Sequence, residues 1–207
     1  MYVSSKVNQS AISEIRAQLP SLIVGDPDAD ETLEDYIAWH DDDPDNLGRY
    51  FSAKELTWLR KWRRRDEPAR RLWPNIIRTR HLAGYLRKQM GFPLIVGNGW
   101  RSPAYNKAVR GASKSMHMEF AALDLDLPIK HRDKTTMTKF YDEAVKLYVA
   151  VGREFNMGLG LYDRRAMGSR VHIDTGRKRI ATWTRKGTPS VARVVAARLG
   201  LQLPRPG

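Results

Sequence analysis

Two short segments, residues 121–127 and 171–175, alternate apolar and polar side chains, and this pattern constrains the fold more than any other feature. Side chains at positions i and i+2 of a strand point to the same face. In the first segment Asp124 lies on the face opposite to three leucines, and in the second His172 and Asp174 share one face. We therefore expect two adjacent strands whose polar faces converge.

A third polar donor precedes the first of these strands. His117 lies seven residues before Asp124, in a loop that begins near residue 111 and is long enough to fold back. Two histidines and one carboxylate are a common protein ligand set for catalytic zinc, which keeps a fourth position open for water. His117, Asp124 and His172 therefore predict one Zn²⁺ site and a metal-dependent hydrolase.

These motifs resemble a known family, the zinc D-alanyl-D-alanine carboxypeptidases and the related phage peptidoglycan endopeptidases. The resemblance spans residues 51–183. It rests on the Gly-Trp-Arg-Ser-Pro-Ala-Tyr-Asn sequence at 99–106, the Ser-x-His-x6-Asp motif that begins at Ser115, the Gly-Leu-Gly-Leu-Tyr sequence at 158–162, the Val-His-Ile-Asp-Thr-Gly sequence at 171–176, and Trp183.

The resemblance implies roles for individual residues. His117, Asp124 and His172 would bind the zinc, and Arg101 would hold the substrate carbonyl or carboxylate. The substrate class it implies is the stem peptide of peptidoglycan. The substrate-binding residues expected beside the metal are Ser115 and Trp183.

Two positions depart from the family pattern. Phe120 stands where the family often has glycine, and we expect this change to alter packing only. Ser169 stands three residues before His172, where many members carry an acidic general base, and a serine does not take a proton from bound water unaided. Asp174 is the replacement candidate, either as the base or as a group that orients an imidazole. Glu119 is a third candidate for the base.

The predicted function is hydrolysis of amide bonds in peptidoglycan stem peptides, of D,D-carboxypeptidase or endopeptidase type, by a phage or prophage lytic enzyme. Bound zinc would activate water and polarise the scissile carbonyl, and Arg101 would stabilise the developing oxyanion. The alternative is a non-catalytic protein on a degenerate peptidase fold that binds cell wall or nucleic acid. The absence of an acid at Ser169 is the feature that favours this alternative.

Other polar residues have structural explanations. No ligand-like spacing surrounds His40, His81 or His131, which we expect to be structural or exposed. Asp126 is expected to be a hydrogen-bonded acid at the end of its strand. The alternative role of Arg101 is a solvated cation in a turn.

Length and composition fit one domain with an N-terminal extension, since the chain has 207 residues, of which 42% are hydrophobic. We predict an acidic extension at 1–50, a zinc peptidase domain at 51–187, and a C-terminal helix and tail at 188–207. The lack of cysteine excludes disulfides and thiolate zinc ligands. Neither a signal peptide nor a membrane span is predicted. We therefore expect synthesis in the cytoplasm and action at the cell wall, through phage-type release or within a virion.

Charge is divided unevenly along the chain. Residues 1–50 contain three Lys and Arg against eleven Asp and Glu, a net charge of −8, whereas residues 51–207 contain 33 against 12, a net charge of +21. A basic surface favours polyanionic partners. Besides peptidoglycan, we consider anionic wall polymers, lipid head groups and, as the rival, nucleic acid. The acidic extension either folds against the basic part or is solvated.

The predicted fold class is α+β: a small central antiparallel sheet that bears the zinc site, flanked by helices, with an N-terminal helical extension. Ser52 and Glu55 form a capping box, and the helix that it begins is predicted to run to Arg65. Further helices are predicted at 8–19, 33–40, 75–89, 136–155 and 189–199, and a strand leading to Arg101 at 92–96.

Overall fold

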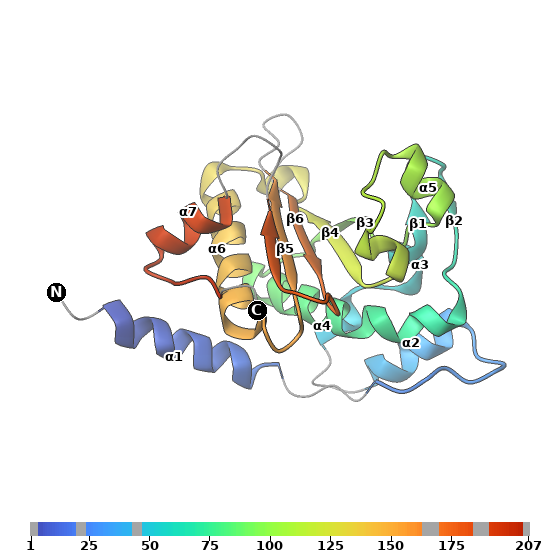
Figure 1. The fold of residues 1–207 in the computed structure, drawn as a ribbon, viewed down its shortest axis with the longest axis horizontal. Coiled ribbons are helices and arrows are strands. Elements are labelled where there is room, and N and C mark those ends of the chain that lie inside the picture. Colours follow the sequence, from blue (N-terminus) through green and yellow to red (C-terminus); the bar gives the residue numbers. More distant parts are fainter. Residues whose placement is uncertain (1–3, 20–23, 43–46, 163–169, 184–190, 205–207) are drawn as a thin grey trace.

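The structure is a computed structural model, and it describes residues 4–19, 24–42, 47–162, 170–183 and 191–204 (Figure 1). The helices are α1 Ser4–Ala17, α2 Leu33–Asp41, α3 Ala53–Thr57, α4 Trp73–Met90, α5 Pro103–Ala108, α6 Lys134–Val151 and α7 Val191–Arg198. The strands are β1 Trp58–Leu59, β2 Arg64–Arg65, β3 Ile95–Asn98, β4 Ala122–Asp126, β5 Gly158–Tyr162, β6 Arg170–Asp174 and β7 Ala181–Trp183. Short 3₁₀ turns are η1 Leu47–Tyr50, η2 Arg70–Leu72, η3 Met116–Glu119 and η4 Ile129–His131.

The fold is α+β, as predicted, around a five-stranded sheet of order β3-β4-β6-β5-β7. The predicted strands at 121–127 and 171–175 are β4 and β6, and they pair directly in antiparallel register. The sheet is not wholly antiparallel, however, because β7 runs parallel to β5. The chain leaves β6, turns at Gly176 with a left-handed φ of 72°, and returns along the outer edge of β5.

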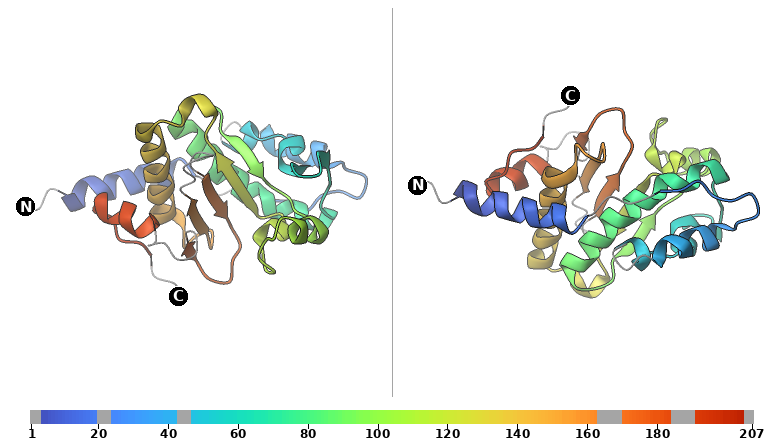
Figure 2. Two further views of the ribbon diagram at one scale, coloured as in Figure 1. Left: turned by 90° about the horizontal axis from the view of Figure 1, so that it is seen from above. Right: turned by 90° about the horizontal axis from the view of Figure 1, so that it is seen from below.

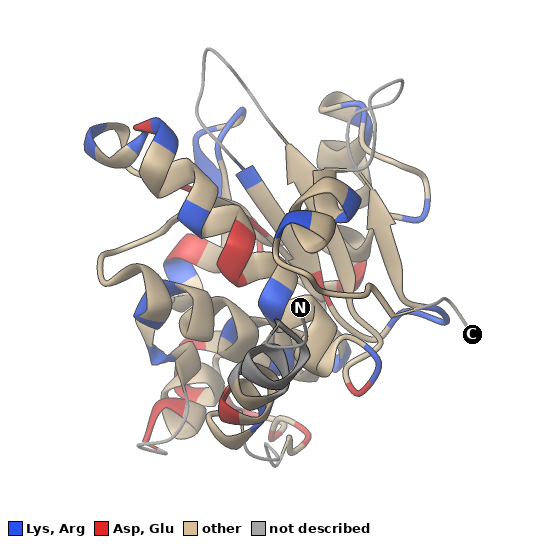
Figure 3. Cartoon of the chain, turned by 90° about the vertical axis from the view of Figure 1, so that its left-hand side faces the viewer, with Lys and Arg blue, Asp and Glu red and all other residues tan. Residues whose placement is uncertain are grey.

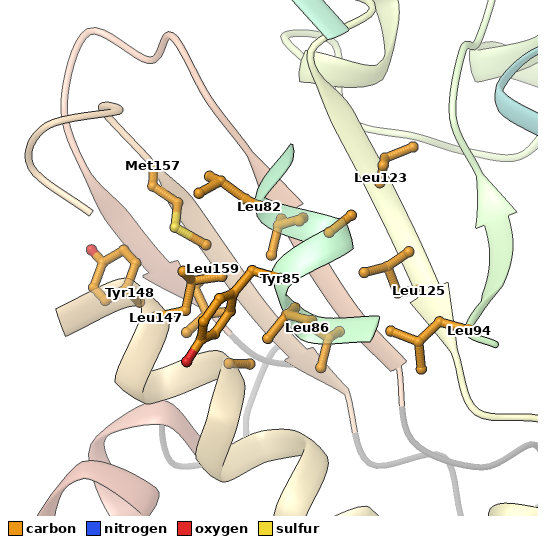
Figure 4. Close-up of a cluster of buried hydrophobic side chains, with 14 of the residues drawn as sticks. Leu82, Tyr85, Leu86, Leu94, Leu123, Leu125, Leu147, Tyr148, Met157 and Leu159 are labelled. Atoms are coloured by element: carbon orange, nitrogen blue, oxygen red, sulfur yellow. The ribbon is translucent and has the colours of Figure 1, made fainter. Parts of the chain in front are cut away.

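Helices α4 and α6 cover one face of the sheet (Figures 1 and 2). The apolar positions of the strands point toward these helices, as the alternation predicts. Their side chains form one hydrophobic cluster with Leu82, Tyr85 and Leu86 of α4 (Figure 4). The polar positions of β4, β5 and β6 therefore lie on the opposite face, where the site is built.

Local sequence signals explain where the two covering helices begin and end. α4 has Pro74 in its first turn and is capped at its C-terminus by Gly91, which adopts a left-handed φ of 76°. α6 is capped at its N-terminus by Asp133, whose side chain accepts a hydrogen bond of 2.9 Å from the backbone N–H of Thr136. Apart from the helix predicted at the capping box, a helix is present at each of the five predicted ranges. α6, however, ends at Val151 rather than at residue 155.

The helix predicted from the capping box to Arg65 is wrong in its second half. The capping box of Ser52 and Glu55 is present, but α3 ends at Thr57 and the chain then forms the β1–β2 hairpin. Tertiary contacts explain the difference, because the ring of Trp62 packs edge-on against Tyr105, with centroids 5.0 Å apart. The predicted strand at 92–96 is also displaced, to Ile95–Asn98.

The acidic N-terminal segment packs against the basic part of the chain. Arg80 of α4 is fully buried, and its guanidinium pairs with Asp41 at the end of α2, at 2.8 Å. On the surface, Glu34 of α2 pairs with Arg65 at 2.5 Å. The main hydrophobic cluster also includes residues from both ends of the chain, such as Ile15 and Val195.

Among the described residues, no helix is both long enough and apolar enough to cross a membrane.

Candidate metal centre

One row of residues crosses all five strands of the main sheet. In register order the row consists of Asn98 on β3, Asp124 on β4, His172 on β6, Gly160 on β5 and Trp183 on β7. Side chains at directly paired positions of adjacent strands lie on the same face. The antiparallel register therefore brings Asp124 and His172 together on the face that helices α4 and α6 leave uncovered.

His117 approaches this row from the short η3 turn. One ligand atom each from His117, Asp124 and His172 lies within 4.8 Å of the others, and all three residues are buried. Oδ1 of Asp124 lies 3.5 Å from Nε2 of His117 and 2.9 Å from Nδ1 of His172. The structure thus brings the three predicted ligands into a cluster that could hold one metal ion.

The hydrogen bonds of His117 leave one ring nitrogen free for a ligand. Nδ1 lies 2.6 Å from the carbonyl oxygen of Gly99, and because a carbonyl only accepts, Nδ1 carries the proton. Nε2 is buried without a hydrogen-bond partner. Burial lowers the pKa of His117 by more than Asp124 raises it, which favours the neutral imidazole. An unpaired buried lone pair that faces a carboxylate fits a metal ligand.

The two oxygens of Asp124 have different partners. Oδ1 faces the two histidines, whereas Oδ2 accepts hydrogen bonds from Asn98 at 2.9 Å and from Arg101 at 2.7 Å. Arg170 adds a third contact to Oδ2, at 3.4 Å. Burial raises the pKa of Asp124, but the histidines lower it by more, so the pKa lies well below its usual value. One oxygen of the carboxylate is therefore fixed by donors while the other faces the cluster.

His172 is held on both sides of its ring. Nδ1 faces Asp124, and Nε2 lies 2.9 Å from Oδ2 of Asp174, which is fully buried. Arg177 binds both oxygens of Asp174, each at 2.5 Å. Burial lowers the pKa of His172, but its bonds to the two carboxylates raise it by more. A Cβ at Gly158 would lie 2.5 Å from Oδ1 of Asp174, so glycine makes room for this arrangement.

The cluster opens into a pocket of about 590 Å³. Arg101, Ser115 and Trp183, which the sequence places beside the substrate, all line this pocket. Asp124 is the only acidic residue among the described residues in its wall. The cationic residues of the wall are Arg101, Arg110, Lys114, Arg170 and Arg177.

Trp183 covers one side of His172, with ring centroids 5.0 Å apart. Its indole Nε1 donates a hydrogen bond of 2.6 Å to the hydroxyl of Tyr162. A Cβ at Gly160 would lie 2.7 Å from the same Nε1. The indole therefore occupies space that only glycine leaves open on β5.

Sequence reasoning assigned no role to several residues of this site. Arg170 carried a detectable signal, since it shares the strand parity of His172 and Asp174 on β6. It binds both oxygens of Asp126, at 2.7 and 2.6 Å, which fits the hydrogen-bonded role expected for that acid. Tyr162 lies in the 158–162 sequence on which the family resemblance rests, whereas Asn98 and Arg177 have no comparable signal.

The remaining candidates do not contribute to the cluster. Glu119 is exposed and lines a different pocket, of about 350 Å³. Ser169 lies outside the described residues. His40 and His81 are buried in the fold, and His131 stacks on a phenylalanine ring at the surface end of η4.

Comparison with known proteins supplies independent evidence. The sequence profile of the Peptidase M15 family matches residues 49–154, slightly more than half of the chain. The match contains His117 and Asp124, and it ends before the strand that carries His172. No curated protein matches the chain. With the profile match and the buried His-Asp-His cluster together, the chain belongs to the peptidase M15 family of metallopeptidases.

Proposed function

We propose that this protein is a zinc peptidase that hydrolyses amide bonds in peptidoglycan stem peptides, of D,D-carboxypeptidase or endopeptidase type. The observation that carries the proposal is the convergence of His117, Asp124 and His172 at the wall of an open pocket. The donor set fits zinc, which with three protein ligands would keep a fourth position for water. When bound there, zinc would lower the pKa of a water molecule and polarise the scissile carbonyl.

The protein's own residues prepare this site. His117 presents Nε2 because Gly99 fixes the proton on Nδ1. Asp124 presents Oδ1 because donors from Arg101 and Asn98 hold Oδ2. These two side chains are already held in place, so they would lose little conformational entropy on binding an ion.

We assign Asp174 to positioning rather than to proton transfer. Its carboxylate contacts Nε2 of His172, the ring nitrogen that does not face Asp124. It has no exposed surface, and Arg177 donates a hydrogen bond to each of its oxygens. A general base must reach the water it deprotonates, directly or through one further water. The geometry of Asp174 instead supports the second role considered from the sequence, in which it orients the imidazole toward the metal.

Arg101 is proposed to act on the substrate while it holds Asp124. Its guanidinium lines the pocket, and its Nε is buried without a hydrogen-bond partner. A substrate carbonyl oxygen that becomes negative in the transition state would gain most from such a donor. Ser115 and Trp183, which line the same pocket, would contact the peptide.

The setting we propose is a phage or prophage lytic enzyme that acts at the cell wall. The strongly basic composition of residues 51–207 supports a wall rich in anionic polymer as the place of action. Lipid head groups and nucleic acid would meet the same charge, and they are the alternatives that binding assays must separate.

Digestion of purified peptidoglycan tests the proposal. Wild-type protein loaded with zinc should release new amino groups, and mass spectrometry of the fragments would identify the cleaved bond. His117→Ala should release none, and chelation should abolish release by the wild type. If wild-type protein with bound zinc leaves peptidoglycan intact, the peptidase proposal fails and a non-catalytic binding role takes its place.

A further inference from the structure

Two basic stretches of the chain meet at one end of the molecule. Residues 58–65 form the β1–β2 hairpin and contain five Lys and Arg, whereas residues 99–118 contain four. Neither stretch contains Asp or Glu. Blue segments lie on helices and loops throughout the view in Figure 3, so basic character is general, and residues 68–98 and 175–207 also contain cations without Asp or Glu. What distinguishes the two stretches is where the fold places them.

The fold places the two stretches side by side. Nζ of Lys61 donates a hydrogen bond of 2.7 Å to the carbonyl of Ala108, at the end of α5. The backbone N–H of Lys61 donates to the hydroxyl of Tyr105, at 3.1 Å. Figure 1 shows α5 next to β1 and β2, at the end of the molecule away from α1. Residues far apart in the sequence thus form one continuous basic surface.

We define this cationic surface by six residues, of which Arg60 has a side chain that is 51% exposed and the others are likewise exposed. They are Arg60, Arg63, Arg64, Lys107, Arg110 and Lys114. Holding six like charges together lowers stability unless a partner neutralises them. Their placement together on an anchored hairpin and the neighbouring helix and loop points to an anionic ligand.

The cationic surface is continuous with the pocket of the metal centre. Arg110 and Lys114 belong to both. At the other end, Arg60 lies 3.9 Å from Asp126, which is bound by the pocket residue Arg170. A polymer bound along the surface would therefore lie next to any peptide held in the pocket.

The chemistry of the surface favours phosphate over stacked bases. Four of its six residues are arginines, which pair with phosphate in a bidentate geometry. Binding of single-stranded nucleic acid also requires free aromatic faces on which bases stack. Arg64 covers the ring of Trp62, 5.1 Å from its centroid, and Tyr105 packs against the same ring. Of the two indoles of the hairpin, that of Trp62 is thus already occupied and that of Trp58 is 39% exposed, so at most one is available to a base.

We propose that the cationic surface binds a cell-wall polymer with a phosphodiester backbone and so holds the enzyme beside its peptide substrate. The choice of a wall polymer rests on the proposed function, whereas the anion site itself rests only on the placement of the six cations. Such binding would be strongly salt-dependent, because each neutralised phosphate releases a counterion.

The test uses full-length His117→Ala protein, so that binding is measured without cleavage. Its co-sedimentation with purified cell walls would be compared before and after hydrofluoric acid removes phosphodiester-linked polymer. In this background, a triple variant (Arg63→Asn, Arg64→Ser, Lys107→Ser) removes three charges outside the pocket. A matched control (Arg71→Ser, Arg78→Ser, Lys88→Ser) removes the same number from exposed positions on and beside α4.

The proposal predicts at least about tenfold weaker binding for the triple variant near 0.15 M salt, and a similar loss on stripped walls. The control should bind as before, and thermal melts should show both variants folded. Equal binding to stripped walls, or an equal loss in the control, would overturn the proposal. Competition by duplex DNA at lower concentrations than the free polymer would reassign the surface to nucleic acid. The peptidase is tested separately with the same three substitutions in protein that keeps His117. Its hydrolysis of a small soluble peptide should equal that of the wild type.

Discussion

Asp124 and His172 are direct register partners on β4 and β6, and Nδ1 of His172 lies 2.9 Å from Oδ1 of Asp124. Because the two strands pair directly, the sheet holds these two side chains in a fixed position relative to each other. His117, from a turn outside the sheet, is the ligand whose position depends on a local contact, the bond to Gly99.

Asp174→Asn distinguishes the two roles considered for this residue. An amide loses one of the two bonds to Arg177 and holds His172 less firmly, so we expect metal affinity to fall by about 10- to 100-fold. Competition with a chromophoric chelator measures that affinity. Unchanged affinity combined with a large loss of kcat would instead identify Asp174 as the general base.

Gly160→Ala tests whether glycine makes room for Trp183. The added Cβ would lie 2.7 Å from Nε1 of Trp183, so the indole has to move from its place beside His172. We expect peptide turnover at low substrate concentration to fall by about tenfold or more, with the bound ion retained. Gly25→Ala is the control, because its new Cβ would make only ordinary contacts, 3.6 Å from Trp39. Full activity in Gly160→Ala would show that the position of Trp183 is unimportant.

Phe120→Gly tests the departure from the family pattern. Phe120 adopts a left-handed φ of 51°, which explains why glycine suits this position, yet its ring is fully buried and packs edge-on near Trp100. Losing the ring costs about 3–5 kcal/mol and relieving the backbone returns about 1–2 kcal/mol. Urea denaturation should therefore show a net loss of about 2 kcal/mol. A more stable variant would mean that backbone strain outweighs packing here.

Asp41→Ala tests how the acidic segment is joined to the rest of the fold. The change leaves the fully buried guanidinium of Arg80 without its charged partner, and we expect a loss of about 3 kcal/mol in the free energy of unfolding. Asp42→Ala, at the exposed neighbouring position, should change stability by less than about 0.5 kcal/mol. Equal effects of the two substitutions would contradict a stabilising role for the buried pair.

The parts of the fold that could be predicted are those with strong local patterns. Alternation located β4 and β6, and Pro74 and Gly91 marked the ends of α4. The β1–β2 hairpin was missed because a real capping box at Ser52 begins a helix that only tertiary contacts, such as that of Trp62 with Tyr105, bring to an end.

The candidate site divides in the same way. The convergence of the three ligands follows from strand parity and the loop before Asp124, which are visible in the sequence. The hydrogen bond from Arg177 to Asp174 is not visible in the sequence, because it depends on the turn that follows β6. Trp183 joins the row of Asp124 and His172 because β7 pairs in parallel with β5. That pairing depends on how the chain turns back after β6, which the alternation of apolar and polar residues does not predict.

The ion content of the purified protein tests the central claim most directly. After zinc loading and dialysis, wild-type protein should retain one zinc per chain by elemental analysis, whereas His117→Ala and His172→Ala should retain almost none. His131→Ala, which removes an imidazole from η4 outside the cluster, should retain as much as the wild type. Wild-type protein without bound zinc, or full retention in both ligand variants, would contradict the metal centre described here.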